Sequence, residues 1–494
     1  MRNSSTRRSF LGSAAGLASA LTGAPAVVAA GRRTNIVLCM GDDHGWNETA
    51  YNGHPYLRTP VLDEMAAAGL RFDRFYSAAP VCSPTRGSIM TGRHPNRYGT
   101  FGANWSTRPE EITIAHILRK AGYACGHFGK WHLGPVKAAS PTNPGAMGFE
   151  EWLSHDNFFE IDPHFSRNGG PVEQFKGESS EIVVSEAIRF IGKAKQNRRP
   201  FFTVIWFGSP HAPYSGVEQD LALYKNVPDK LLQARFAEIT ALDRAMGQLR
   251  RYLKSAELRQ DTLLWYCGDN GVPPEGRLTT PFRGHKGQVY EGGLRVPGII
   301  EWPERIRKPR ATEVNAVTSD MLPTICELAG QPLPPRPLDG VSLIPLLEGG
   351  MRERPKPICF WQYDQRREMK EDAKPYISPE LQQGTTPTAT LMDGRLTRSF
   401  RNYRHPRVTE EDFAGDAAIL GNRYKLVAPG KPSVESGPGP SPSSPATELY
   451  DVRDDRGETK DLIQVKPEIA KDMERQLREW QRSVLASLTG ADYR

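Results

Sequence analysis

The chain has 494 residues, more than one ordinary hydrophobic core encloses, so one large domain and a smaller one are expected. Hydrophobic residues make up 38% and charged residues 24% of the chain, a composition typical of globular proteins. The net charge of +7 at pH 7 is small and dispersed, and no dense basic stripe with interleaved aromatic residues occurs, so nucleic-acid binding is not expected.

The first thirty residues are predicted to be a targeting segment. Twin arginines, Arg7 and Arg8, precede an apolar, alanine-rich run that ends at Ala30. This pattern is typical of a bacterial Tat export signal, and Val28-Ala29-Ala30 offers a small-residue cleavage site. Glycine and proline interrupt the run, which favours a cleaved signal at 1–30 over a lone membrane anchor. We therefore expect the Tat machinery as a partner, a periplasmic or secreted protein, and no stable membrane insertion.

From Asn35 onward, short apolar runs alternate with helical patterns. The predicted strands are Asn35–Met40, Tyr123–Phe128, Phe201–Phe207, Thr262–Cys267 and Val296–Trp302. The predicted helices are 60–68, 112–120, 181–195, 229–258 and 319–329. This alternation predicts an α/β fold in which a large mixed, mainly parallel sheet is sandwiched by helices.

The pattern changes after the proline-rich stretch Gln331–Pro337 and becomes shorter and more polar beyond about Pro355. Strands at Asn422–Val427 and Glu448–Val452 and a terminal helix at Pro467–Leu488 predict a small α+β domain with an antiparallel sheet. The segment 429–445 is rich in Pro, Ser and Gly and is expected to be a disordered loop. We therefore expect a large domain at 33–354, which carries the candidate site residues, and a smaller one at 355–494.

Polar residues follow four of the predicted strands. These residues are Asp42-Asp43, the segment Gly129–Gly134 with Lys130 and His132, then His211, and finally Asp269-Asn270. In open α/β sheets, ligands bind outside the carboxyl ends of the strands. The sequence therefore predicts one site built from four separate segments.

Asp42, Asp43, Asp269 and Asn270 offer only hard oxygen ligands. Such a set suits Ca²⁺ or Mg²⁺ better than zinc or copper. One Asp-Asp pair alone is usually a cap or a turn, but two such pairs at strand ends favour a metal site.

Cys82 is unusual among the six cysteines, which form no CxxC pair and so predict neither a zinc–thiolate site nor a dense disulfide framework. It lies in a polar, turn-rich segment, whereas Cys39, Cys125 and Cys267 lie in apolar runs. Pro84 suits the first turn of a helix, whose N-terminus can hold an oxyanion. Arg86 adds a guanidinium fork suited to sulfate or phosphate oxygens.

With these residues the sequence resembles the sulfatase family of the alkaline phosphatase superfamily. Cys82-Ser83-Pro84-Thr85-Arg86 followed by Thr91-Gly92-Arg93 is similar to the C-x-P-x-R…T-G-R element that directs oxidation of the cysteine to formylglycine. Gly129–Gly134 is similar to the second signature of the family. The match continues in chain order, from about Asn35 to Pro303, with Asp42-Asp43, His211, Asp269-Asn270 and Lys286-Gly287.

The resemblance implies a sulfatase that hydrolyses sulfate monoesters, with carbohydrate esters preferred over aryl esters as the expected substrates, and releases inorganic sulfate. The hydrated formylglycine at position 82 attacks sulfur and forms a covalent sulfo-enzyme intermediate. One Ca²⁺ is held by Asp42, Asp43, Asp269, Asn270 and an oxygen of residue 82. The implied partners are a sulfated small molecule or glycan and a formylglycine-generating or other sulfatase-maturating enzyme.

The resemblance also implies a role for each remaining site residue. Arg86 anchors the modified side chain, Lys130 binds a sulfate oxygen, and His132 acts as base on the diol. His211 and Lys286 bind the ester and assist the leaving oxygen.

Two other functions remain open from the sequence. Phosphonate and phosphate ester hydrolases share the superfamily fold, but they tend to present Asp-His where this chain has Asp269-Asn270. A non-catalytic protein that binds sulfated glycans would be expected to lack the cysteine or a metal ligand, and neither is lost. The loops at 100–108 and 154–170 are the predicted determinants of substrate choice.

Overall fold

The chain folds around an eleven-stranded mixed sheet whose neighbouring strands run in the order β10-β2-β9-β8-β1-β7-β3-β4-β5-β6, with β11 paired to β2. In this computed structural model the described residues are 33–363, 374–387, 395, 397–407, 413–430 and 446–493. The predicted targeting segment 1–30 and residues 431–445 of the predicted loop lie outside them. The strands are β1 Asn35–Gly41, β2 Leu70–Tyr76, β3 Ala124–Lys130, β4 Glu151–His155, β5 His164–Arg167, β6 Val172–Gln174, β7 Phe201–Trp206, β8 Thr262–Gly268, β9 Arg295–Glu301, β10 Arg310–Thr312 and β11 Ala316–Val317.

The centre of this sheet is parallel, as the sequence predicts. β1 pairs in parallel with β7 on one side and β8 on the other, and β3 pairs in parallel with β7 and β4. Antiparallel pairs occur further out, where β9 joins β8 and β2, and where β5 joins β4 and β6. Because the four central strands are parallel, their carboxyl ends meet at one edge of the sheet.

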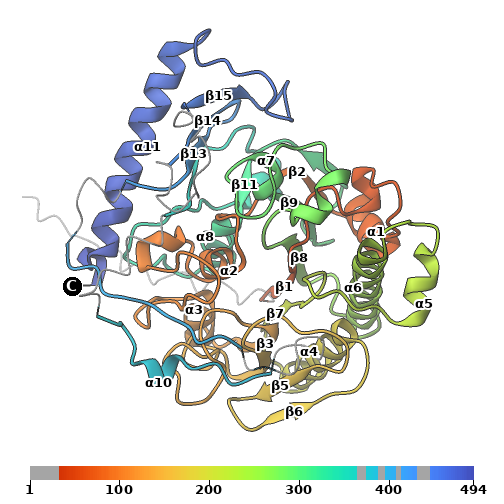
Figure 1. The fold of residues 1–494 in the computed structure, drawn as a ribbon. Coiled ribbons are helices and arrows are strands. Elements are labelled where there is room, and N and C mark those ends of the chain that lie inside the picture. The colour runs from red at the N-terminus through yellow and green to blue at the C-terminus, as the bar shows by residue number, and fades with distance from the viewer. Residues whose placement is uncertain are drawn as a thin grey trace, which may run out of the picture. The chain divides into compact units, whose positions relative to one another are not determined.

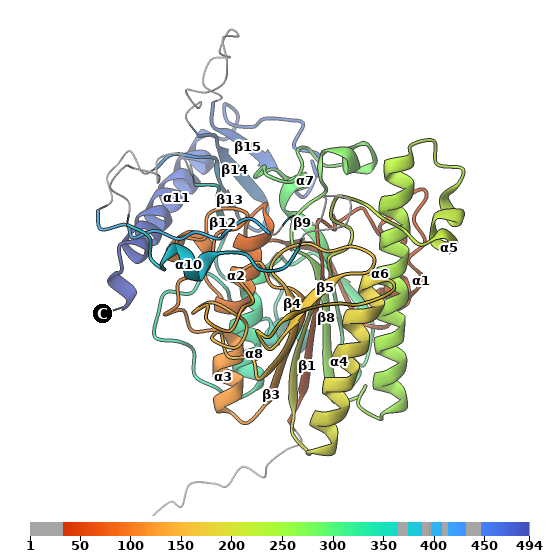
Figure 2. The same ribbon diagram turned by 60° about the horizontal axis from the view of Figure 1, so that its bottom comes forward.

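Helices cover both faces of the sheet, which confirms the predicted sandwich (Figure 2). The longer helices are α1 Pro60–Ala68, α2 Cys82–Thr91, α3 Ile114–Lys120, α4 Ser179–Gln196, α6 Lys230–Ser255 and α8 Met321–Leu328. The short ones are α5 Glu218–Leu221, α7 Glu291–Leu294, α9 Ile344–Leu347 and α10 Pro379–Gln382. Asp229, at the start of the predicted helix 229–258, is the N-cap of α6 and accepts hydrogen bonds from the backbone of Leu231 and Leu232.

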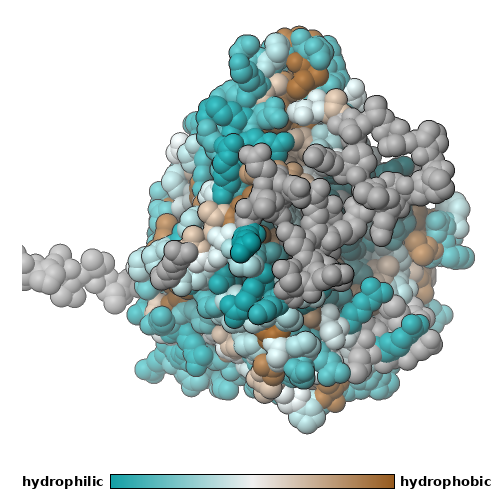
Figure 3. Space-filling view, turned by 60° about the vertical axis from the view of Figure 1, so that its left-hand side comes forward, coloured by the Kyte–Doolittle hydropathy of each residue, from teal (hydrophilic) through white to brown (hydrophobic). Residues whose placement is uncertain are grey.

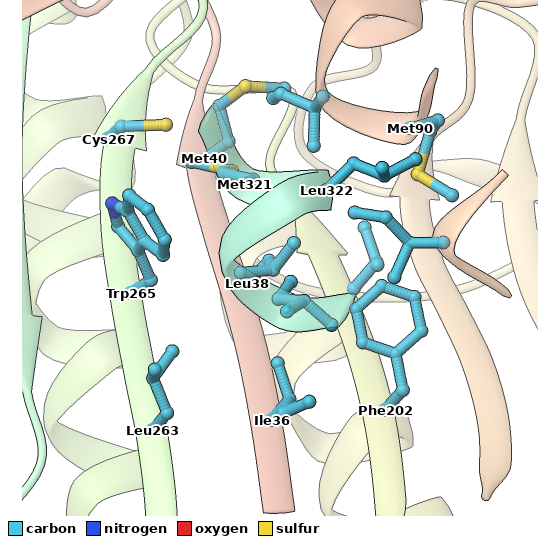
Figure 4. Packing of buried hydrophobic residues seen from close by; sticks show 14 of the residues in the cluster. Ile36, Leu38, Met40, Met90, Phe202, Leu263, Trp265, Cys267, Met321 and Leu322 are labelled. Atoms are coloured by element: carbon cyan, nitrogen blue, oxygen red, sulfur yellow. The ribbon is translucent and has the colours of Figure 1, made fainter. Parts of the chain in front are cut away.

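β1 shows how its residues divide between the two helical layers. Ile36, Leu38 and Met40 lie in one core cluster, and Figure 4 shows them on the side of the sheet where Met321 and Leu322 of α8 pack. Val37 and Cys39 point to the opposite face and pack with residues of α1, α4 and α6. A strand buried on both faces reads as a continuous apolar run, and this is why β1 is recognisable in the sequence.

A smaller antiparallel sheet follows, in the order β12-β13-β14-β15. Its strands are β12 Ile358–Trp361, β13 Ala417–Leu420, β14 Tyr424–Ala428 and β15 Glu448–Asp451. The terminal helix α11, Pro467–Leu488, lies along this sheet (Figure 1) and packs through Leu477, Val484 and Leu485. The predicted antiparallel sheet and terminal helix are thus present.

The small sheet also shares a core with the large one. Phe360, Leu420 and Val427 pack in one cluster with Tyr76 at the end of β2 and Leu294 of α7. Residues 34–494 form one compact unit, and the boundary between 354 and 355 stays a prediction.

The surface in Figure 3 presents mainly hydrophilic residues, with hydrophobic ones scattered among them. None of the helices in the described part of the chain combines the length and the apolar character needed to cross a lipid bilayer.

Candidate active site

The predicted site residues come together at the carboxyl ends of the central strands. Asp42 and Asp43 follow β1, Lys130 ends β3, His211 follows β7, and Asp269 follows β8. These four strands are neighbours in the order β8-β1-β7-β3, so their ends lie side by side. Backbone hydrogen bonds tie the loops together, from Asp42 N to Ser209 O at 3.0 Å and from Asp269 N to Gly41 O at 3.1 Å.

Two carboxylates after β1 are held by lysines from other elements. Lys130 Nζ lies 2.6 Å from Asp42 Oδ2, and both side chains are completely buried. Lys286 Nζ lies 2.7 Å from the carboxylate of Asp43. Burial alone would raise the pKa of Asp42, but Lys130, His211 and Arg86 outweigh it and hold this pKa well below its ordinary value. Asp42 is therefore an anion at neutral pH.

Asp269 and Asn270 complete the acidic cluster. Asp269 Oδ1 accepts a hydrogen bond from Asp43 N at 2.8 Å, and Asn270 Nδ2 donates to Asp43 Oδ1 at 2.9 Å. Burial, with the neighbouring Asp42, raises the pKa of Asp269 to about 7, while Arg86 opposes the rise. Ionising Asp269 beside Asp42 and Asp43 therefore costs free energy unless a further positive charge is present.

Cys82 is the first residue of α2 and is buried, with a relative exposure of 2%. Val81, the N-cap of α2, is extended and its side chain offers no capping hydrogen bond. Thr85 Oγ1 instead donates to Ala79 O at 2.7 Å and so holds the segment that leads into the helix. Gly92, with φ of 69°, ends the helix in the left-handed conformation that glycine favours. Burial raises the pKa of the Cys82 thiol to about 11, so the unmodified thiol is protonated at neutral pH.

Arg86, one turn further along α2, ties three of the loops together. Its Nη2 lies 2.8 Å from Asp269 Oδ2 and 3.5 Å from Asp42 Oδ1, and its Nη1 donates to Lys130 O at 3.1 Å. The guanidinium carbon lies 5.1 Å from the ring centroid of Trp206. Such a fully buried arginine fixes the spacing of the acidic residues and supplies charge next to Cys82.

His132 takes its orientation from Asn104. His132 Nε2 contacts Asn104 twice: the side-chain Oδ1 lies 2.8 Å away, and the backbone N–H of Asn104 points to the same nitrogen at 3.3 Å. The shorter contact, to an amide oxygen that only accepts, favours the tautomer with the proton on Nε2. The other nitrogen, Nδ1, is buried and has no hydrogen-bond partner among the described residues. Burial lowers the pKa of His132 well below its ordinary value, and Lys130 adds to this effect. The ring is therefore neutral and keeps one unshared electron pair.

His211 and Lys286 form the more open side of the site. His211 Nε2 lies 3.4 Å from Lys286 Nζ, and the His211 ring stacks on Phe158 at a centroid distance of 4.6 Å. Burial lowers the pKa of His211 to about 4 against the pull of Asp43. Burial also disfavours the charge on Lys286, but Asp43 outweighs it and raises the pKa of Lys286. At neutral pH this pair is a neutral imidazole beside an ammonium group.

The donor atoms suit a hard cation. Ligand atoms of Asp42, Asp43, Cys82 and His211 all lie within 4.8 Å of one another. Asp42 Oδ1 and Asn270 Oδ1 are buried and accept no hydrogen bond from the described residues, and Asp42 Oδ1 has only the ion pair with Arg86 at 3.5 Å, so both oxygens can accept a further partner. This group includes His211, which the sequence did not predict as a ligand, and does not include the predicted ligand Asp269, whose two oxygens accept from Asp43 N and Arg86 Nη2, both at 2.8 Å.

Other histidines near these segments have structural partners instead. His44 contacts Tyr266 Oη and Glu48 O, both at 2.6 Å. His127 packs among Trp131, Phe149 and Trp206. His155 and Asp156 face the backbone of 385–387 rather than the acidic cluster. Sequence reasoning did not single out Phe158 or Phe400, which contact His211 and His132, because an isolated phenylalanine carries no local signal.

The fold and this cluster define a hydrolase with an acidic, oxygen-rich centre beside the N-terminus of a helix. The family model for Sulfatase matches residues 34–331, and the chain therefore belongs to the sulfatase family. It is similar to N-acetylgalactosamine-6-sulfatase of Mus musculus, with 32% identity over 65% of this chain and 68% of the relative. It is also similar to human arylsulfatase A, with 32% identity over 68% of this chain and 71% of the relative.

The fold agrees with a solved structure as well. The structure of Ps i-CgsB in complex with k-i-k-neocarrahexaose superimposes with a TM-score of 0.72 at 23% identity and covers 91% of this chain and 93% of that chain. The protein is thus a sulfuric ester hydrolase with the fold of the alkaline phosphatase superfamily.

Proposed function

We propose that the protein hydrolyses sulfate monoesters of carbohydrates and that residue 82, as formylglycine, is the nucleophile. The observation that carries this proposal is that three carboxylates and three cationic side chains converge around Cys82 at the start of α2. These residues are Asp42, Asp43, Asp269, Arg86, Lys130 and Lys286. A carbohydrate substrate is supported by the similarity to N-acetylgalactosamine-6-sulfatase, whose name specifies a sulfated amino sugar.

The metal in this proposal is one Ca²⁺, held by Asp42, Asp43, Asp269, Asn270 and an oxygen of residue 82. The all-oxygen side chains and the two orphaned oxygens support a hard cation there. When bound, Ca²⁺ supplies positive charge that neutralises the sulfate group and polarises the nucleophile. It would also offset the effects of burial and of the neighbouring Asp42, which raise the pKa of Asp269 to about 7.

The other charged and ionisable side chains of the site have separate roles in this proposal. Lys130 and Arg86 are buried cations that hold the acidic cluster and face the sulfate oxygens with positive charge. His132, neutral and with Nδ1 unpartnered, accepts the proton of the nucleophile. Lys286, charged and in contact with His211, stabilises the negative charge on the leaving oxygen and delivers a proton to it.

The proposal includes maturation and export. A formylglycine-generating or other sulfatase-maturating enzyme would act on the segment Cys82–Arg86. The twin arginines Arg7-Arg8 would direct a Tat-dependent export to the periplasm or beyond. Within the exported chain, 33–354 would be the catalytic domain and 355–494 a smaller domain packed against it.

The experiment compares kcat/KM for nitrophenyl sulfate, phosphate and phosphonate esters on one calcium-loaded sample, with Cys82→Ala as the control for contaminating activity. We expect the ratio to favour the sulfate ester. A sulfate monoester carries one negative charge near neutral pH and a phosphate monoester close to two, while three carboxylates already surround the site. Asn270 adds a ligand oxygen without adding charge. A preference for phosphate or phosphonate would overturn the proposed function and leave the fold unaffected.

A further inference from the structure

Residues 395–407 carry an arginine at every third position and no acidic residue. These arginines are Arg395, Arg398, Arg401, Arg404 and Arg407. We call the continuous described part of this segment, residues 397–407, the arginine strap. It lies between α10 and β13 along the chain and can be followed by its colour in Figures 1 and 2. None of the roles derived above uses it.

The arginine strap is fastened beside the active site by its backbone. Arg401 N donates to Asn104 O at 3.1 Å, and Ser106 N donates to Arg401 O at 3.0 Å. Phe400 N donates to Gln382 O at 2.8 Å, and the Phe400 ring lies 6.1 Å from the ring of His132. The strap therefore pairs with the loop that carries Asn104, the partner of the catalytic histidine.

The side chains that hold the strap in place are buried, whereas two of its arginines are exposed. Thr397, Phe400 and Asn402 are buried, whereas Arg398 and Arg404 are exposed. Thr397 is held by Thr386 through two hydrogen bonds of 3.0 Å. The side chains that hold the strap are thus different from those that carry its charge, so a change at Arg398 or Arg404 leaves the anchors in place.

The two exposed arginines are available to an anion. Neither Arg398 nor Arg404 forms an ion pair with a carboxylate of the described residues. The Arg404 guanidinium lies over the ring of Tyr376 at 4.4 Å, an arrangement that holds its plane and leaves its edge N–H groups to bind oxygen. Such a planar fork matches a sulfate or a carboxylate in two hydrogen bonds.

Both arginines lie close along the chain to the residue that contacts His132. Arg398 is two residues from Phe400, so their Cα atoms are at most about 7 Å apart, and Arg404 is four residues from Phe400 on the other side, at most about 14 Å away. These upper limits place both cations within the span of an oligosaccharide bound beside His132.

We propose that Arg398 and Arg404 form a second anion subsite that selects carbohydrate substrates bearing a further sulfate or carboxylate beyond the ester that is cleaved. This inference rests on the proposed function and deepens it. The cleaved sulfate enters the acidic cluster at Cys82, and the second anionic group of the same saccharide binds the strap. The substrate class is then a polyanionic saccharide rather than a simple aryl sulfate.

The test compares four proteins on three disaccharides. The proteins are the wild type, Arg398→Gln/Arg404→Gln, the charge-preserving Arg398→Lys/Arg404→Lys, and the control Arg307→Gln/Lys308→Gln, which removes two exposed charges elsewhere. The disaccharides carry one sulfate only, two sulfates, or one sulfate and one carboxylate. The third substrate shows which anionic group the subsite accepts.

We expect the kcat/KM of the dianionic disaccharides, divided by that of the monosulfated one, to fall about tenfold in the Gln variant through a higher KM. The Lys variant should fall less and the control not at all. Added NaCl should reduce the wild-type preference and have less effect on the Gln variant. An unchanged ratio in the Gln variant, or an equal loss on all three disaccharides, would overturn the subsite.

A binding measurement separates this proposal from the proposed function. Calorimetric titration of the disulfated disaccharide into Cys82→Ala protein, with and without the Gln substitutions, reports the subsite without turnover. If the Gln variant binds the disaccharide more weakly but the wild type releases no sulfate, the proposed function is refuted and the anion subsite is still supported. Normal sulfate release with equal affinities in the two proteins would refute the subsite alone.

Discussion

At the scale of single residues, the proposed role of His132 as a base depends on which of its ring nitrogens keeps an electron pair. Asn104 decides this through its side-chain oxygen, which itself receives a second contact from Asn157 Nδ2 at 3.3 Å. Asn104 has a φ of 61°, in the left-handed region that asparagine tolerates better than most residues. We therefore propose that Asn104 is a positioning residue that orients His132.

We predict that Asn104→Ala lowers kcat roughly tenfold to a hundredfold with a smaller effect on KM, because the His132 tautomer is no longer fixed. Asn104→Asp should instead raise the pKa of His132 by placing a negative charge at Nε2. Since a base is lost as pH falls through its pKa, the acid limb of the kcat profile should move to higher pH in this variant.

The matched control for Asn104 is Asn168→Ala. Asn168 also has a left-handed backbone, with φ of 52°, and its side chain accepts a hydrogen bond from Trp152 N, away from His132. Its pH profile should equal that of the wild type. Identical profiles for Asn104→Asp and the wild type would contradict the positioning role.

At the scale of secondary structure elements, the C-terminal sheet supports the loop that carries Lys286. Lys425 of β14 is fully buried and lies 3.0 Å from Glu291 Oε1 and 2.8 Å from Glu458 Oε1. Glu458 also accepts a hydrogen bond from Glu291 N, at the start of α7, at 2.7 Å. This buried group of three charges holds α7, and with it the preceding loop, against the small sheet.

Replacement of Lys425 by Met should lower the free energy of unfolding by about 3–5 kcal/mol, because Glu291 and Glu458 stay buried and lose the cation between them. Urea unfolding measures this change. The control is Arg475→Gln, which breaks ion pairs with Asp472 and Glu479, both at 2.7 Å, between side chains that are all more than half exposed, and it should cost much less. Equal effects of the two substitutions would contradict a stabilising role for the buried charges.

The elements that the sequence predicts are those buried on both faces. β1, β7 and β8 read as apolar runs, and the polar residues after them were recognised because parallel strands end at one edge. β2 was not predicted, because Arg71, Asp73 and Arg74 interrupt its apolar pattern. Arg71 and Asp73 pair with each other at 3.0 Å, and Arg74 donates to Asn422 O at 3.0 Å, far along the sequence.

The arginine strap shows a second limit of sequence reasoning. Its spacing is visible in the sequence, but its place is set by backbone hydrogen bonds to Asn104 and Ser106, almost three hundred positions earlier, as in Arg401 N to Asn104 O at 3.1 Å. An extended segment with no apolar period carries no local signal for such a partner. The family motifs therefore predicted the catalytic centre and left its surroundings open.

At the scale of the whole molecule, the large sheet and the C-terminal part of the chain both support the site. The parallel centre of the large sheet brings four loops together, α2 delivers residue 82 to them, and the C-terminal part supports one side of the site through Lys425 and the other through the strap. The central claim is that residue 82 acts as formylglycine. The thiol seen at this position is buried and protonated, so activity should require its conversion.

The most direct measurement is the mass of the tryptic peptide that ends at Arg86, taken from preparations whose sulfate-ester hydrolysis has been measured. The account predicts an aldehyde at residue 82, reactive with hydrazides, in a fraction of molecules that rises in proportion to kcat per total protein. Full activity in a preparation whose Cys82 is wholly an unmodified thiol would contradict it.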